Sequence, residues 1–312
     1  MQDETQARRE APDDRRLTGV EADACRGLRD VVLAAGGIDI SRYKDRCLLR
    51  RIAVRQRASG AATLQAYLTL VRRDPVERGQ LVKALTIHVS QFFRNPSTFQ
   101  ALQHEVLPAI LAEKERTGSR ALRFWSAGCA CGEEAYSLAL LLRETAPGAL
   151  GRYSTTIYGT DIEPECLRAA REGRYAAASL RSVPACWRQR YFARAGAGYA
   201  VGPALRDLVH FKRHNILDPA PFGRIDLLVF RNVLIYMADS LQEQVLIGLH
   251  GALNAGGYLV LGKVEGLSGA AKDLFAPVNV PERIYRKRER PSRARAARPD
   301  NPRDHRATGH SA

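Results

Sequence analysis

Two glycines and two carboxylates lie close together in the segment from Ser126 to Glu134. Gly128 and Gly132 allow a turn to approach a bound ligand closely, and Glu133 and Glu134 follow at the expected start of a helix. Because a helix N-terminus attracts anions, a phosphate site would not place two acids beside it. The cluster therefore favours a ligand with a cationic or hydroxyl-bearing group. The alternative is that both glutamates only complement the helix dipole.

Further polar residues follow apolar runs that read as strands. Asp161 ends one such run and is placed to accept hydrogen bonds from both hydroxyls of an adenosine ribose. Asn215 follows the next run, and Arg231 and Asn232 follow Ile225–Phe230. Polar residues that end neighbouring buried strands line one shared pocket. The alternatives are a helix cap for Asp161 and structural turns for the others.

Strands that alternate with helices position these residues. The expected strands are Ala121–Ala127, Thr155–Thr160, Leu208–Lys212, Ile225–Phe230 and Gly257–Gly262. The expected helices are Glu133–Glu144, one that begins at Pro164, and Ser240–Leu253. This alternation predicts an α/β fold with a doubly wound, mainly parallel sheet. Residues 175–206 interrupt the rhythm and are expected to form a small inserted β-subdomain.

The chain before this sheet has a different pattern. Residues 17–88 show helical periodicity and no alternating strand pattern, which predicts a small all-helical domain. Residues 1–16 read as a disordered charged leader, and residues 289–312 as a disordered basic tail. The break between the helical domain and the sheet is expected near residues 86–92.

Two other kinds of site fit this layout less well. Dinucleotide oxidoreductases share the alternation, but their G-x-G-x-x-G fingerprint is absent from the turn Gly128–Gly132. Cys129 and Cys131 lack the C-x-x-C spacing and have no second Cys or His pair at ligand spacing. Small residues that fill a tight turn explain them more simply than a metal or redox pair.

Four segments carry a specific likeness to a known family. They are Val89–Asn95, Phe124–Ser137, Gly159–Ile162 and Arg231–Met237. In this order, and within residues 20–288, they resemble the chemotaxis receptor protein-glutamate O-methyltransferases, the CheR family. The resemblance implies an S-adenosyl-L-methionine-dependent enzyme with a helical N-terminal substrate-docking domain. It also implies a Rossmann-like class I methyltransferase domain, here residues 89–288, that carries a small β-subdomain.

The resemblance also implies the site residues. The family's contacts to S-adenosyl-L-methionine and to its product S-adenosyl-L-homocysteine fall on His88, Ser90, Arg94, Glu133, Asp161, Asn215, Ile216, Arg231 and Asn232. The family usually has Asn at the position of His88. An imidazole still donates or accepts one hydrogen bond, so we expect cofactor binding to survive this change. No metal is expected.

The implied reaction transfers a methyl group from a sulfonium to a glutamate carboxylate and yields a glutamyl methyl ester. A Glu with an unperturbed pKa of about 4.3 is ionised at neutral pH, so no general base is required. Catalysis then rests on proximity, orientation and loss of water. Arg94 and Tyr236 are expected to position the carboxylate. The alternatives are a domain-junction salt bridge for Arg94 and a packed aromatic for Tyr236.

A basic face is expected on one helix of the N-terminal domain. At 100° per residue an arc of about 80° holds four arginines. These are Arg42, Arg46, Arg50 and Arg57. Leu48, Leu49 and Ile52 lie on the opposite side. Methyl-accepting receptor segments are long helices rich in Glu, so we expect this face to steer the receptors' cytoplasmic helices. The alternative is the solvated face of an amphipathic helix.

Two other functions share some of these features. A catalytically inactive scaffold that binds S-adenosyl-L-methionine would accommodate His88, but Arg94, Glu133, Asp161 and Asn232 are all present. A nucleic-acid methyltransferase would suit the net charge of +15. The Asn/Asp-Pro-Pro-Tyr/Phe signature of the amino-methylating enzymes is missing, however, so nucleic acid is not an expected partner.

The sequence also bears on location. Its apolar runs stay short of the roughly 18 residues that a membrane helix needs. The polar N-terminus lacks the apolar core of a secretory signal. We therefore expect a cytoplasmic monomer that does not insert into the membrane.

Overall fold

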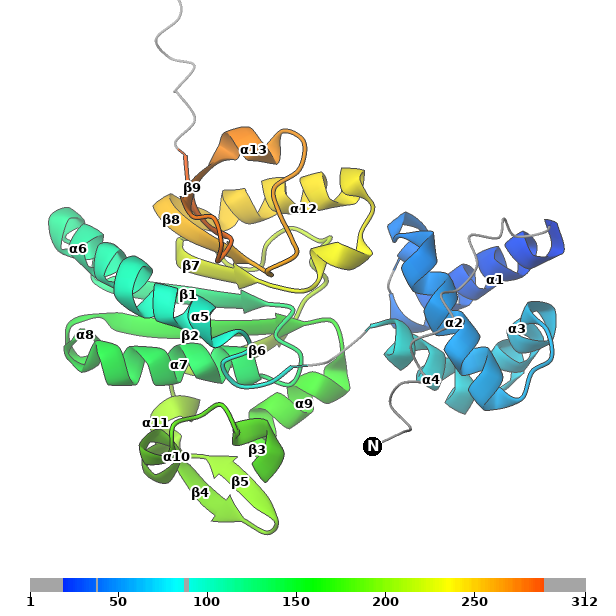
Figure 1. The fold of residues 1–312 in the computed structure, drawn as a ribbon, viewed down its shortest axis with the longest axis horizontal. Coiled ribbons are helices and arrows are strands. Elements are labelled where there is room, and N and C mark those ends of the chain that lie inside the picture. Colours follow the sequence, from blue (N-terminus) through cyan, green and yellow to red (C-terminus); the bar gives the residue numbers. More distant parts are fainter. Residues whose placement is uncertain (1–18, 38, 87–89, 289–312) are drawn as a thin grey trace, which may run out of the picture.

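The computed structural model describes residues 19–37, 39–86 and 90–288. A helical part, which ends at Leu85, is followed by an α/β part (Figure 1). The leader 1–16 and the tail 289–312, for which we predicted disorder, lie outside the described residues, and so does His88. None of the helices in the described ranges is long and apolar enough to cross a membrane.

Four helices pack together in the helical part. They are α1 (Gly19–Gly36), α2 (Asp45–Ser59), α3 (Leu64–Arg73) and α4 (Pro75–Leu85). Their apolar faces meet in one buried cluster that includes Leu28, Ile52 and Leu81. Thr63 and Asp74 cap α3 and α4, because each side chain accepts a backbone N–H of the first turn.

Seven strands form the main sheet, in the order β6-β2-β1-β7-β8-β10-β9. They are β1 (Ala121–Ala127), β2 (Ser154–Asp161), β6 (Val209–Arg213), β7 (Ile225–Phe230), β8 (Leu253–Leu261), β9 (Phe275–Asn279) and β10 (Ile284–Lys287). The first five in this order are parallel, and β10 is antiparallel to both of its neighbours. The carboxyl ends of the parallel strands share one edge, which faces the helical part (Figure 1).

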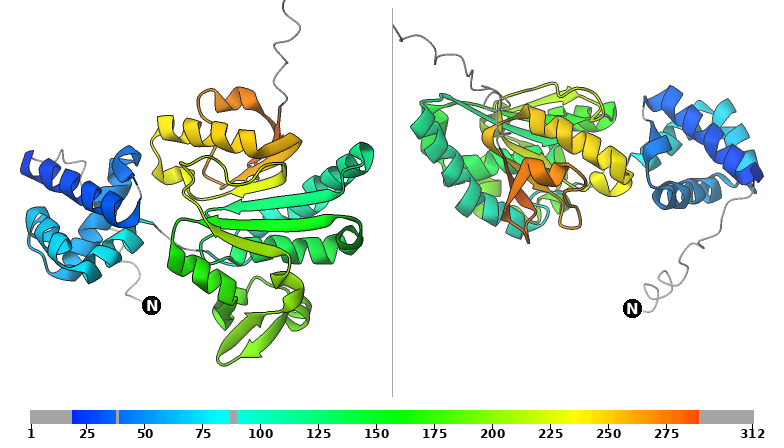
Figure 2. Two further views of the ribbon diagram at one scale, coloured as in Figure 1. Left: turned by 180° about the vertical axis from the view of Figure 1, so that it is seen from behind. Right: turned by 90° about the horizontal axis from the view of Figure 1, so that it is seen from above.

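The central strands are buried on both faces. Phe124 of β1 packs into one apolar cluster and Trp125 into the other, and Leu227 and Leu228 of β7 alternate in the same way. Helices of the first cluster are α5 (Pro96–Ala101), α6 (Leu107–Thr117), α7 (Glu133–Thr145) and α8 (Pro147–Arg152). Helices of the second are α12 (Asp239–Ala252) and α13 (Ala271–Leu274). Figure 2 shows the two layers from behind and from above. The predicted doubly wound, mainly parallel sheet is thus confirmed.

A second, smaller sheet is inserted between β2 and β6. Its antiparallel strands, in the order β3-β5-β4, are β3 (Arg174–Ala176), β4 (Phe192–Ala195) and β5 (Gly198–Val201). α10 (Ala185–Tyr191) packs against β4, whereas α9 (Pro164–Glu172) and α11 (Pro203–Arg206) pack against β6 of the main sheet. This confirms the inserted β-subdomain that the sequence predicted.

The last part of the sheet differs from the expectation. β8 begins at Leu253, whereas we expected the strand to begin at Gly257. Gly256 has a left-handed φ of +68°, and the pairing with β7 is irregular there, so the segment reads as a turn in the sequence. The hairpin of β9 and β10 was not predicted, because β9 is an edge strand interrupted by Pro277.

Candidate active site

A cavity of about 380 Å³ lies where the helical part meets the carboxyl edge of the sheet. Both parts form its wall, with Arg51 and Leu85 from the helical part. Eight of the predicted site residues line it: Ser90, Arg94, Asp161, Asn215, Ile216, Arg231, Asn232 and Tyr236. A second cavity, of about 410 Å³, lies at the amino ends of the strands beside Asp226, and its described walls hold none of them.

The turn Gly128–Gly132 joins β1 to α7 and is fastened to the end of β2. The backbone N–H of Ala130 donates to Oδ2 of Asp161 at 2.8 Å. Gly132 has φ +93°, and a Cβ there would lie 2.8 Å from the Cβ of Ala170. Only glycine fits this position, both for its backbone angle and for the space available.

Asp161 ends β2 and presents its carboxylate to the cavity. Its two oxygens accept backbone N–H groups, from Ala130 at 2.8 Å and from Glu163 at 3.1 Å. Glu163, rather than Asp161, caps α9, because its side chain accepts the N–H of Glu165 at 3.5 Å. A carboxylate oxygen can accept more than one hydrogen bond. Asp161 can therefore also accept a ligand hydroxyl.

The two glutamates at the start of α7 have different surroundings. Glu134 lines the cavity, but its carboxylate accepts from Ser126 Oγ at 2.7 Å and pairs with Arg231 at 3.2 Å. Glu133 is buried and is not among the described residues that line the cavity. Its Oε2 has no hydrogen-bond partner in the described chain. Burial raises the pKa of the Glu133 carboxyl, and a hydrogen bond with Ser90 partly opposes this shift. Buried acceptor oxygens of this kind normally have a hydrogen-bond donor as partner.

Arg231 follows β7 directly, and only 1% of its side chain is exposed. Besides the pair with Glu134, its guanidinium donates to the carbonyl of Arg94 at 2.8 Å and to Oδ1 of Asn95 at 2.6 Å. A buried charge is tolerated only when it is paired and hydrogen-bonded. Arg231 therefore ties the start of α7 to the segment that carries Arg94.

The segment Phe93–Asn95 holds Arg94 against the cavity in a strained backbone. Phe93 and Asn95 have left-handed φ angles of 52° and 61°. Each such residue costs about 1–3 kcal/mol and persists only where its surroundings fix it. Ser137 of α7 accepts the N–H of Phe93 at 3.0 Å, and Arg231 binds the other end. The position of Arg94 is thus set by contacts on both sides of it.

Tyr236 is in contact with the helical part. Its carbonyl accepts the backbone N–H of Lys44 at 2.8 Å. The guanidinium of Arg51 lies 5.6 Å from the centroid of its ring, within cation–π range. Residues that lie far apart in the sequence therefore form this side of the cavity.

Asn215 and Ile216 follow β6 at another side of the cavity. Asn215 Nδ2 donates to the carbonyl of Gly37 in the helical part at 3.5 Å. His214 lies 6.0 Å from Trp125, ring centroid to ring centroid, and burial lowers the pKa of its imidazole. A largely neutral aromatic surface therefore adjoins the amide of Asn215.

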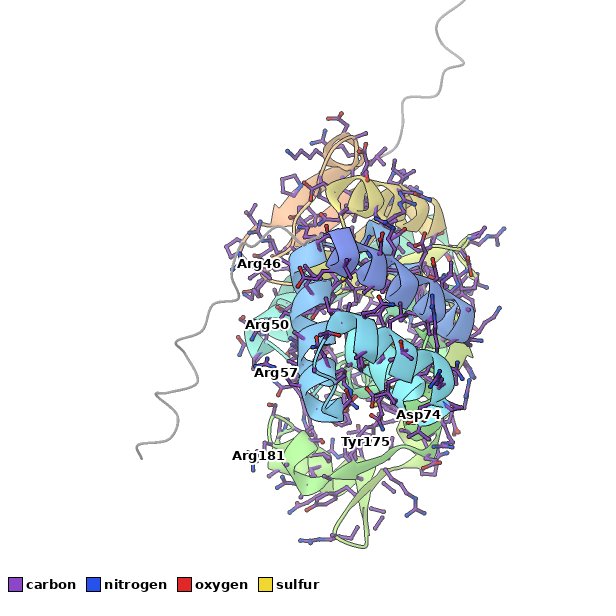
Figure 3. All side chains as sticks on the ribbon, turned by 90° about the vertical axis from the view of Figure 1, so that its right-hand side faces the viewer. Arg46, Arg50, Arg57, Asp74, Tyr175 and Arg181 are labelled. Atoms are coloured by element: carbon purple, nitrogen blue, oxygen red, sulfur yellow. The ribbon has the colours of Figure 1, made fainter. Side chains whose placement is uncertain are left out.

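Three of the four predicted arginines form an exposed face on α2. Arg46, Arg50 and Arg57 lie along one side of the helix (Figure 3), and we call them the basic face of α2. Leu48 and Ile52 are buried on the opposite side, as expected.

The expectation that Arg42 shares this helix is wrong. Arg42 lies in a 3-10 turn, Ile40–Arg42, before α2. Tyr43 is extended and pairs with Met237 across to the α/β part, and the carbonyl of Arg42 accepts the N–H of Ala238 at 2.9 Å. Because this backbone pairing occupies residues 42–44, the helix begins only at Asp45.

Sequence analysis missed several cavity residues, among them Tyr43, Arg51 and His214. His214 directly precedes Asn215, so its place at a strand end was a usable signal. Arg51 stands among many arginines of α2, and nothing in the sequence separates it from Arg50. Tyr43 reaches the cavity through the pairing of its extended segment, which has no sequence signature.

The cysteines of the turn are part of the packing. Cys129 is buried, and the Sγ atoms of Cys131 and Cys166 lie 3.1 Å apart. Within residues 19–37, 39–86 and 90–288, no group of three or more His, Cys, Asp and Glu side chains could hold a metal ion.

Comparison with known proteins gives two family matches. The CheR methyltransferase SAM-binding domain matches residues 88–284, and the CheR methyltransferase all-alpha domain matches residues 24–86. The two matches correspond to the α/β part and the helical part.

Three relatives illustrate the similarity. The putative methyltransferase Cher3 of Pseudomonas putida is 37% identical over 258 residues, which are 80% of this chain and 91% of that protein. Chemotaxis protein methyltransferase 1 of Pseudomonas aeruginosa is 37% identical over 208 residues, 64% of this chain and 75% of that protein. An uncharacterized 104.1 kDa protein of Rhodobacter capsulatus is 36% identical over 265 residues, 85% of this chain but 27% of that longer protein. With matches of this extent to both of its parts, the chain belongs to the CheR methyltransferase family.

Proposed function

We propose that the chain is a cytoplasmic protein-glutamate O-methyltransferase. It uses S-adenosyl-L-methionine to methylate glutamate side chains of methyl-accepting chemotaxis receptors. The observation that carries the proposal is the cavity between the two parts, whose wall joins Asp161 and Asn232 to Arg94 and Tyr236. The SAM-binding family match supports the cofactor. The name of the Pseudomonas aeruginosa relative, chemotaxis protein methyltransferase, supports the substrate.

The described residues fit an adenosyl cofactor. Asp161 offers a carboxylate for ribose hydroxyls, and Asn215 and Ile216 form a wall for adenine. The unpartnered Oε2 of Glu133 suits the α-amino group, next to Ser90 in the cavity wall. Acceptors of this kind match hydroxyl and ammonium groups rather than phosphate. When bound, S-adenosyl-L-methionine supplies an electrophilic methyl group on a sulfonium.

The task of the chain is then to orient the substrate carboxylate. Glutamate is already ionised at neutral pH, so the site requires no general base. The guanidinium of Arg94 and the hydroxyl of Tyr236 hold the carboxylate in the cavity. Arg94 must not hold it too firmly, because the carboxylate loses its charge as the ester forms. Arg51 supports the Tyr236 ring from the side of the helical part.

The basic face of α2 suits an acidic helical substrate. Arg46, Arg50 and Arg57 are exposed on the same helix that places Arg51 in the cavity wall. Opposite charges steer the encounter and orient the partner. One chain carries both the docking face and the cavity, so a monomer suffices.

Methylation of receptors tests the reaction and its two positioning groups together. The protein is incubated with methyl-labelled S-adenosyl-L-methionine and membranes that carry candidate receptors, and alkali-labile label is counted. Arg94→Ala should lower turnover about 10²-fold, because the carboxylate is no longer oriented. Tyr236→Phe should lower it about tenfold, because it removes one hydroxyl. Equal and negligible effects of both changes would show that the active centre lies elsewhere.

Cofactor affinity tests the role of Asp161. Asp161→Ala should weaken binding of S-adenosyl-L-homocysteine tenfold to a hundredfold, since a charge-assisted hydrogen bond is worth about 1.5–3 kcal/mol. Calorimetric titration measures this, and Asp273→Ala, which removes an exposed carboxylate of α13, is the matched control. An unchanged affinity in Asp161→Ala contradicts the assignment.

The raised pKa of Glu133 predicts how cofactor affinity depends on pH. Its carboxyl has a pKa above the usual 4.5, because it is buried. An ammonium ligand binds the ionised form, so affinity should fall as the pH is lowered through this raised pKa, by up to about tenfold per pH unit. The raised pKa of Glu133 has the opposite effect on the stability of the protein without ligand, which should be greater at low pH. The folded state holds the extra proton, so this contribution is present below the unfolded pKa and is lost as the pH rises.

The measurement is calorimetric affinity for S-adenosyl-L-homocysteine from neutral pH down towards 4.5. Glu133→Gln should bind more weakly at neutral pH and show a flatter profile. Parallel profiles for Glu133→Gln and the wild type would remove Glu133 from the cofactor site.

Charge reversal tests the basic face of α2. Arg46→Glu with Arg50→Glu should raise the KM for receptor about tenfold at low salt and leave cofactor affinity unchanged. The difference should shrink as salt rises, because exposed charges are screened over about 8–10 Å. Arg152→Glu with Arg168→Glu, two exposed arginines of the α/β part, gives the same change in net charge as a control. If both pairs behave alike, the face is ordinary solvated surface.

A further inference from the structure

Two neighbouring parallel strands end beside the proposed site. Phe230 of β7 pairs with Leu261 of β8, so the segments that follow both strands leave the sheet side by side. The segment after β7 carries Asn232 and Tyr236, and the segment after β8 begins with Gly262. The contacts between these two segments therefore set the orientation of Asn232 relative to the cavity.

One buried carboxylate joins the two segments. Glu265 is 4% exposed and is not among the described residues that line the cavity. Its Oε2 accepts the backbone N–H of Asn232 at 2.9 Å and that of Gly262 at 2.6 Å. Its Oε1 accepts the backbone N–H of Ile235 at 3.3 Å. Three donors from two strand ends therefore converge on one side chain.

The space around this carboxylate is filled. A Cβ on Gly262 would lie 2.6 Å from Oε2 of Glu265 and 2.9 Å from Nδ2 of Asn232. Asn232 itself has a left-handed φ of 62°, a conformation that a non-glycine residue adopts only where its surroundings impose it. The hydrogen bond from its own N–H to Glu265 is a contact of that kind.

We propose that Glu265 is a positioning residue for methyl transfer, which holds Asn232 in its left-handed conformation so that its side chain faces the cofactor. The inference rests on the proposed function, because it takes Asn232 as a cofactor contact. A carboxylate suits the task because both of its oxygens only accept. Gln would replace one acceptor with an NH₂ group that opposes a backbone donor.

A purely structural role of Glu265 predicts a different result. If Glu265 only joins β7 to β8, its loss lowers the melting temperature and leaves cofactor affinity alone. If it acts through Asn232, its loss weakens cofactor binding, and it does so only while the Asn232 side chain is present. Double-mutant combinations separate the two, since residues that act through one another are not additive.

The experiment measures the affinity for S-adenosyl-L-homocysteine by calorimetry. Glu265→Gln should bind tenfold or more weakly, as expected for loss of charge-assisted hydrogen bonds. In an Asn232→Ala background the same change should add less than about twofold, and in an Asp161→Ala background it should add its full effect. Full additivity with Asn232→Ala overturns the proposal.

Asp226→Asn is the matched control. Asp226 is 5% exposed at the other end of β7, where its carboxylate accepts the N–H of Arg123 at 2.9 Å and pairs with Lys114 at 2.7 Å. Its loss should lower the melting temperature and leave the affinity within about twofold of the wild type. Equal losses of affinity in Asp226→Asn and Glu265→Gln would mean that binding follows overall stability, which overturns the proposal.

Gly262→Ala perturbs the same contact without removing the carboxylate, and it decides the matter if Glu265→Gln does not fold. Its methyl group displaces Glu265 from Asn232, so the affinity should again fall tenfold or more, with the same dependence on Asn232. Wild-type affinity in Gly262→Ala overturns the proposal. The wild-type affinity for S-adenosyl-L-homocysteine is measured first, before any variant is compared. A wild-type protein that does not bind this ligand overturns the proposed function instead.

Discussion

The buried guanidinium of Arg231 is the interaction on which the rest of the site depends. With 1% of its side chain exposed, it must be paired, and Glu134 supplies the opposite charge. Removing one partner of such a pair costs about 3–5 kcal/mol, because the other charge stays buried. The Nη2 of Arg231 also donates to the carbonyl of Arg94 and to the amide oxygen of Asn95. One ion pair thus joins the end of β7, the start of α7 and the strained turn that carries Arg94.

Buried polar groups with several partners also lie at other points where the described chain leaves the sheet. Strands buried on both faces end in backbone N–H groups that need acceptors, and here buried carboxylates provide them. Asp161 accepts the N–H of Ala130 in the glycine turn, and Glu265 accepts three N–H groups beyond β7 and β8. All of these bonds are made between groups of the chain itself. The fold itself therefore holds the polar wall of the cavity in place, and fixed polar groups lower the cost of orienting a reaction.

The fold and the strand-end residues followed from the sequence because both depend on local pattern. Buried strands are continuous apolar runs, so Asp161, Asn215 and Asn232 could be placed at their ends. The neighbours Glu133 and Glu134 could not be told apart, since both stand at a helix start and only the fold brings Arg231 to one of them. Arg42 was misplaced because its backbone pairs with a segment almost 200 residues away. Side chains that work through such distant partners leave no periodic signal.

The helical part belongs to the site itself. Its backbone binds the carbonyl of Tyr236, and its Arg51 covers the ring. Arg50, which directly precedes Arg51 in the sequence, is exposed on the same helix. The proposed docking face and the cavity wall are therefore formed by adjacent residues of α2, whose side chains point about 100° apart around the helix axis. On the proposed function, one helix therefore serves both to dock the receptor and to form part of the cavity in which the methyl group is transferred.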